Sequence, residues 1–229
     1  MHLPMRLDVH LMLSIREAPD TNGLILRLLG DFYVDGLGSV LRFQNAGGGL
    51  HPYTTSGTAE SVLVEAREKL SVEREAVAPR PRGASGVWIQ LRDSNVQPLT
   101  TEILLGHWKA GPFKMRSEFH TPCQAVVWVK AQDCELRGGP GLALDGEVSF
   151  LDHITARVLL LPKGRSPKNA APTEGVEIPL LAPGESIPFG ERMVRGGVGG
   201  TPRVTLQFVN GSGARLGSEF LVGRCVQLR

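Results

Sequence analysis

Residues 3–15, LPMRLDVHLMLSI, alternate apolar and polar side chains over most of their length. Every odd position is apolar, and the even positions include Arg6, Asp8, His10 and Ser14. Successive side chains of a β-strand point to opposite faces of a sheet, so a period of two places one row on a core and the other toward solvent. An α-helix would scatter the same apolar row around its circumference. The stretch therefore predicts a long, half-buried β-strand.

Residues 62–76 are open to two interpretations. Their centre, EAREKL at 65–70, consists of residues that favour helices. The even positions are nevertheless mostly apolar and the odd positions mostly polar, with only Glu68 and Arg74 interrupting the even row. This pattern favours one long strand or a pair of strands over a helix.

Further segments show the same strand signals, and turn sequences such as Asp35-Gly36 and Asn210-Gly211 separate several of them. Segments of this number and spacing predict an all-β protein, built as an antiparallel sandwich or jelly roll. The 28 glycines and 16 prolines agree with many turns and few helices. The predicted strands are 24–34, 38–44, 86–92, 101–108, 125–131, 146–151, 154–161, 176–181, 203–209 and 218–228.

The segment 78–85, APRPRGAS, has two prolines and no periodicity, which is typical of a linker or crossover. It predicts two β units, an N-terminal one at 1–77 and a larger C-terminal sandwich at 86–229. The alternative is one single β domain over 1–229, in which 78–85 is a long loop. Together with 46–56 and 162–175, this segment is too long for a simple turn, so we expect these loops to carry contacts.

Charge and hydropathy make several classes of function improbable. Lys and Arg number 25 against 23 Asp and Glu, so bulk electrostatics gives no reason to expect nucleic acid as a partner. No apolar run reaches the roughly 18 residues that a membrane-spanning helix needs. The first residues become charged at Arg6, too early for a signal peptide, so none is expected.

The three cysteines, Cys123, Cys134 and Cys225, form no Cys-x-x-Cys pair. Reduced, buried or half-buried thiols are the expectation. A disulfide between Cys123 and Cys134 is the alternative, if the two face each other across a hairpin.

Motifs for catalysis or metal binding do not emerge. The six histidines show none of the short spacings that place metal ligands on one face, and His107 and His120 would be the first ligands to consider. Gly-x-Ser-x-Gly is absent, and the glycine clusters 47–49 and 196–200 lie between strand signals, as flexible loops do. We therefore expect no enzyme, no cofactor, no metal and no small-molecule substrate, and assign no catalytic or binding residues.

The C-terminal third has a recurring order of strand, loop and strand. It runs from RVLLLP at 157–162 through VEIPLLAPGESIPF at 176–189 to RVTLQFV at 203–209. This order resembles small β-sandwich or jelly-roll domains of bacteriophage virion proteins. The resemblance implies a structural subunit of a virus particle: a capsid, decoration, connector or tail protein. Its partners would be copies of itself and other virion proteins, and it would reside in the virion after assembly in the host cytoplasm.

The alternative is a non-viral β-sandwich that serves as a binding or scaffold module for a carbohydrate or protein ligand. Such a module presents a cluster of exposed aromatic side chains. Here the aromatic residues are dispersed, and Trp88, Trp108 and Trp128 lie in or beside predicted strands. We expect these tryptophans to pack in the core or at an interface.

Overall fold

The computed structural model describes residues 1–229 except 20–21, 46–56, 138, 196–201 and 225–229. The described chain forms fourteen β-strands and one short 3-10 helix at Pro167–Asn169, with no α-helix, which confirms the all-β prediction. The strands are β1 (His2–Glu17), β2 (Gly23–Val34), β3 (Leu37–Asn45), β4 (Gly57–Val64), β5 (Lys69–Pro79), β6 (Ser85–Arg92), β7 (Ile103–Trp108), β8 (Phe113–Leu136), β9 (Gly139–Phe150), β10 (Ile154–Pro162), β11 (Val176–Leu181), β12 (Ser186–Arg195), β13 (Pro202–Asn210) and β14 (Arg215–Arg224).

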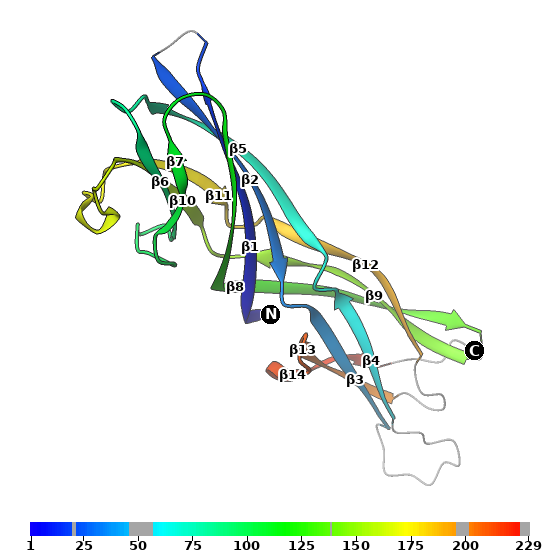
Figure 1. Cartoon of the computed structure of the whole chain (residues 1–229). Helices are drawn as coiled ribbons and strands as arrows, with labels where there is room; N and C mark the ends of the chain where they lie inside the picture. The colour runs from blue at the N-terminus through cyan, green and yellow to red at the C-terminus, as the bar shows by residue number, and fades with distance from the viewer. Residues whose placement is uncertain (20–21, 46–56, 138, 196–201, 225–229) are drawn as a thin grey trace.

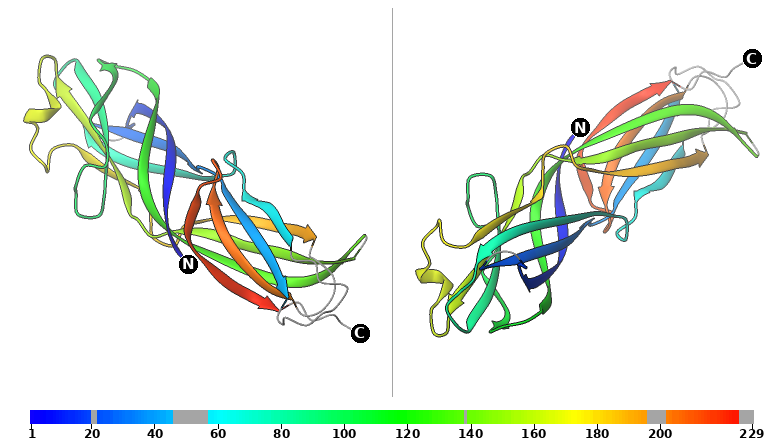
Figure 2. Two further views of the ribbon diagram at one scale, coloured as in Figure 1. Left: turned by 90° about the horizontal axis from the view of Figure 1, so that it is seen from below. Right: turned by 90° about the horizontal axis from the view of Figure 1, so that it is seen from above.

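The strands form three antiparallel sheets. Sheet A has the order β12-β9-β8-β1-β2-β5, sheet B the order β14-β13-β3-β4, and sheet C the order β11-β10-β6-β7. Figures 1 and 2 show an elongated molecule with two lobes. In one lobe the strands β8, β1, β2 and β5 lie against sheet C, and in the other β8, β9 and β12 lie against sheet B. Sheet A therefore runs through both lobes.

Two of the strand connections that carry the chain between the lobes also carry it between sheets A and B. β2 leaves sheet A at Asp35-Gly36, where Gly36 has a φ of +69°, and continues in sheet B as β3. β4 returns to sheet A as β5 through the turn at 65–68, closed by a hydrogen bond from the Glu68 amide to the Glu65 carbonyl. The stretch 62–76 is thus two strands, as its alternation indicated, and the helical alternative is excluded.

Alternation along the strands builds the core. The odd residues of β1 from Leu3 to Ile15 are all buried, while the even residues are exposed or half-buried. The long first strand predicted from the sequence is therefore confirmed. Phe32, Phe43, Phe150 and Phe208 are the largest of the fully buried side chains, and they come from four different strands.

The sequence prediction was too short at β8 and missed β12. Strand 125–131 extends in the structure over Phe113–Leu136, and its first half includes the inward positions Ser117 and Thr121. Because these inward positions are polar, the sequence shows no alternation of apolar and polar residues there. At β12 the ladder slips between Phe189 and Arg192, which breaks the alternation. Of the predicted strand 218–228, residues 225–228 lie outside the described chain.

The segments on either side of 78–85 share one sheet. β1 pairs with β8 from His2 opposite Val126 to Ile15 opposite Phe113. β5 continues to Pro79, which pairs with Gly23, and β6 begins at Ser85.

The described residues contain no helix long and apolar enough to cross a membrane.

Candidate functional site

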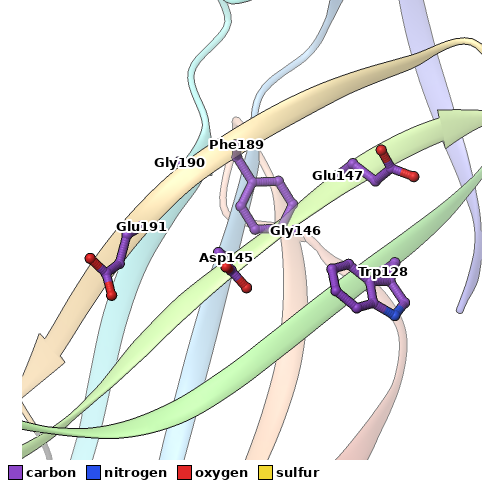
Figure 3. Close-up of a pocket in the computed structure, with 7 residues that line it drawn as sticks. All are labelled: Trp128, Asp145, Gly146, Glu147, Phe189, Gly190 and Glu191. Atoms are coloured by element: carbon purple, nitrogen blue, oxygen red, sulfur yellow. The ribbon is translucent and has the colours of Figure 1, made fainter.

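A shallow hollow of about 670 Å³ lies on the β8-β9-β12 part of sheet A. It is open to solvent, and Figure 3 shows the residues around it. Its lining residues come from three neighbouring strands: Trp128, Asp145, Gly146, Glu147, Phe189, Gly190 and Glu191.

The strand register brings these residues together. Trp128 of β8 lies opposite Glu147 of β9, and Glu147 lies opposite Pro188 of β12. Beyond Phe189, a register shift leaves Gly190 and Glu191 outside the regular ladder. Such a bulge bends the strand and redirects its side chains, so Glu191 reaches the same hollow.

Gly146 leaves room at the base of this hollow. A Cβ atom at this position would overlap the main-chain oxygen of Trp128 and would come within 2.8 Å of the Phe189 ring. Only a glycine lets β8 and β9 approach this closely while the Phe189 ring stays in place.

The hollow carries three carboxylates. Glu147 accepts hydrogen bonds from the hydroxyls of Ser149 (2.9 Å) and Ser186 (3.0 Å), which hold its carboxylate in one orientation. One oxygen of Asp145 is shielded from solvent and has no hydrogen-bond partner among the described residues. None of the ion pairs formed within the described chain involves Asp145, Glu147 or Glu191.

Trp128 is 56% exposed although it lies within a regular strand. An exposed indole face is attractive to cations and to other flat or apolar groups, and the nearby carboxylates favour cations or hydrogen-bond donors. The site is therefore suited to hold a basic side chain or a hydroxyl-rich ring.

A second hollow, of about 580 Å³, lies over β1 and β8 and includes Arg6, His120 and Pro122. Beside it, Nδ1 of His120 lies 2.7 Å from an Asp8 carboxylate oxygen, and Nε of Arg6 donates to the same oxygen at 3.1 Å. Partial burial opposes ionisation of Asp8, but the hydrogen bonds from His120 and Arg6 outweigh it and lower the pKa of the Asp8 carboxyl.

The two histidines considered first for a metal belong to different sheets. His107 is on β7 of sheet C, and His120 is on β8 of sheet A, paired with Asp8. Over the described ranges, no three His, Cys, Asp or Glu side chains gather as a metal site. Cys123 and Cys134 are free thiols, so the alternative of a disulfide between them is excluded. Cys225 lies outside the described residues.

The loop predicted at 162–175 is tied to buried arginines. Arg157 donates hydrogen bonds to the carbonyls of Glu174 (2.8 Å) and Ala171, and Arg92 donates to the carbonyl of Pro172 (3.2 Å). These hydrogen bonds tie the loop to β6 and β10 of sheet C. The predicted loop 46–56 and the glycine cluster 196–200 lie outside the described residues.

Sequence reasoning assigned no residue to a site, and it expected Trp128 in a core or an interface. A signal for exposure was present. Ala125, Val127, Val129 and Ala131 make up one row of β8, and Trp128 belongs to the other row. The carboxylates had no comparable signal, because their meeting depends on the pairing of β8, β9 and β12.

No protein-family model, curated protein or solved structure matches this chain.

Proposed function

We propose that this protein is a structural subunit that acts through protein–protein contacts, as a capsid, decoration, connector or tail component of a virus particle. The observation that supports a contact role is Trp128, an indole 56% exposed on a regular strand. The viral setting rests on the resemblance of the C-terminal third to virion β-sandwich domains.

Trp128 has the properties of an interface anchor. Tryptophan and arginine are enriched among the residues that contribute most to protein–protein binding, and such residues cluster in well-packed central pockets. Asp145, Glu147 and Glu191 line the same hollow as the indole and give it negative charge, so the complementary surface presents a basic side chain there. The chain itself carries 19 arginines and 6 lysines.

Measuring the molar mass of the purified protein by light scattering, together with electron microscopy of any particles, tests this proposal. We expect assemblies larger than a monomer, and we expect Trp128→Ser to weaken assembly at least tenfold. Val77→Ser is the matched control, because Val77 is 67% exposed on β5 and is not part of the hollow. A chain that stays monomeric at high concentration, with candidate partners present, would overturn the proposal.

The second candidate function is a non-viral carbohydrate-binding module. This function is supported by the cross-strand pair of Trp128 and Glu147, because two serine hydroxyls orient the Glu147 carboxylate. A sugar ring stacks on an indole while its hydroxyls donate to a fixed carboxylate. Titration of tryptophan fluorescence with cellohexaose and chitohexaose tests this function. Saturable binding by a monomer, lost in Trp128→Ser, would favour the module over the structural subunit.

A further inference from the structure

A narrow turn, residues 109–112, connects β7 of sheet C to β8 of sheet A. Figure 1 shows it in green at the outer end of the lobe that contains sheet C. Lys109, Ala110 and Pro112 are exposed, and Gly111 has a φ of +79°, which suits a glycine. The turn therefore presents one lysine among small or ring-shaped residues.

The body of the lobe holds this turn in place. The indole N–H of the buried Trp108 donates to the Gly111 carbonyl at 3.0 Å. The guanidinium of Arg80 lies over the Trp108 ring, 5.9 Å from its centroid, and also pairs with Glu17 at 2.8 Å. A segment that is already fixed loses little conformational entropy when it binds. The turn is thus preorganised for insertion into a partner.

Positive charge gathers around this turn. At this end of sheet C, Trp108 lies opposite Ser85, and Ser85 lies opposite Pro162. The segments that continue from these three positions, and the start of β8, bring together four exposed cations, which we call the basic tip: Arg82, Lys109, Lys114 and Lys163. None of the four forms an ion pair within the described chain.

The Trp128 hollow has the complementary character. Its three carboxylates face one lysine, Lys130, which lies opposite Asp145 in the β8-β9 ladder. One Asp145 oxygen has no hydrogen-bond donor among the described residues. The indole of Trp128 is 56% exposed, and a cation over an indole face is attracted by the ring. The hollow therefore suits an additional ammonium group brought by a partner.

We propose that the 109–112 turn of one copy of this chain inserts into the Trp128 hollow of the next copy, with the Lys109 ammonium against the indole and the Glu147 carboxylate. This inference rests on the proposed function, and it specifies how the subunits join. The basic tip and the hollow belong to different lobes of an elongated molecule (Figure 2). The contact is therefore head-to-tail, and repetition closes a ring or extends a filament.

A second copy is the partner that the charges favour. Complementary charge on two surfaces orients them during encounter and disfavours other arrangements. Here both surfaces belong to one chain, so every tip in a solution of this protein meets hollows at the same concentration. Since the contact depends on exposed charges, we expect it to weaken between 0.05 and 0.5 M NaCl.

A charge swap, followed by sedimentation velocity over a dilution series, tests this contact. Lys109→Glu and Glu147→Lys should each weaken self-association at least tenfold, because each places like charges together. The double variant should return to within fivefold of the unmodified chain. Arg215→Glu makes the same change of charge on β14, in the other lobe, and is the matched control, expected to associate within threefold. Circular dichroism establishes that the variants fold.

Mixing two defective variants tests the head-to-tail geometry. Lys109→Glu keeps an intact hollow, and Trp128→Ser keeps an intact tip. Each alone should remain largely monomeric, whereas their mixture should form a 1:1 complex that grows no further. An equimolar mixture that forms no complex would overturn the proposal.

Crosslinking of the unmodified chain gives an answer that depends on no variant. A carbodiimide joins an amine directly to a carboxylate, so in a mixture of ¹⁴N- and ¹⁵N-labelled protein it should couple Lys109 of one copy to Glu147 or Glu191 of another. Mass spectrometry identifies the mixed-isotope peptides. Their absence from assembled protein would overturn the insertion even if Lys109→Glu failed to fold.

The outcomes separate this inference from the proposed function. Assembly that Trp128→Ser weakens but Lys109→Glu leaves unchanged overturns the insertion and leaves the structural role standing. Lys109→Glu may be titrated with double-stranded DNA as well: loss of DNA binding with unchanged self-association would assign the tip to nucleic acid and overturn the proposal. A chain that stays monomeric at every concentration and with every partner overturns both.

Discussion

Gly146 packs so closely on the main-chain oxygen of Trp128 that a Cβ atom at position 146 would overlap it. A main-chain atom within a sheet cannot rotate away as the end of a flexible side chain can. Gly190 lines the same hollow, and a Cβ atom there would meet nothing within 4 Å. The close packing of β8 and β9 therefore requires a glycine at position 146, whereas the space around Gly190 would admit a side chain.

Gly146→Ala should lower the free energy of unfolding by about 2 kcal/mol or more, because β8 and β9 must separate locally to admit the methyl group. Gly190→Ala is the control and should change it by less than about 0.5 kcal/mol. Urea unfolding followed by tryptophan fluorescence measures both values. Equal effects of the two substitutions would contradict the close approach of β8 and β9 at Trp128.

Arg157→Ala should destabilise the protein by about 1–3 kcal/mol, because it leaves the carbonyls of Ala171 and Glu174 without their donor. The loop 163–175 should then be cut faster by proteases. Arg165→Ala is the control, since its ion pair with Glu174 is partly exposed and should be worth less than about 1 kcal/mol. Limited proteolysis and thermal unfolding of both variants check this prediction. Deletion of 165–171 removes the Ala171 carbonyl and should cost stability for the same reason.

Asp8 should stabilise the protein at neutral pH and lose this effect in acid. The pKa of the Asp8 carboxyl is lowered from 3.8 by hydrogen bonds from His120 and Arg6, against the opposing effect of partial burial. A carboxyl whose pKa is lower in the folded state than in the unfolded state stabilises the folded protein at pH values above its unfolded-state pKa. This stabilisation disappears as the pH falls through the folded-state pKa. The stability difference between the unmodified protein and Asp8→Asn should therefore shrink below about pH 4. Urea unfolding at pH 7, 5, 4 and 3 tests this, and a difference that grows in acid would refute it.

Cys123 should react with iodoacetamide only when the protein unfolds. Burial, with a further contribution from Asp152, raises the pKa of the Cys123 thiol to about 12, so its thiolate is scarce at pH 8. Cys134 is half-buried, and its thiol should be labelled in the folded state, although burial, Glu191 and Asp133 raise its pKa as well. Peptide mass spectrometry resolves the two sites. If Cys123 were labelled as fast as Cys134 in the native protein, this result would contradict the burial of the Cys123 thiol.

The sequence predicted the strands whose inward row is uniformly apolar. The odd residues from Leu3 to Ile15 are all apolar, and their burial in β1 depends only on the period of two. The prediction fell short where the core accepts small polar groups, as at Ser117 and Thr121 of β8. It also missed β12, because the register shift after Phe189 interrupts the alternation that a sequence can reveal.

By itself, the sequence determined the all-β class and the positions of most strands, because alternation is a local property of neighbouring residues. The tertiary structure alone decided which strands pair, and hence that Trp128 of β8 lines one hollow with Asp145 and Glu147 of β9 and Glu191 of β12. Strand pairing joins residues far apart in the chain through backbone groups that every residue carries, so side-chain identity reveals little of it.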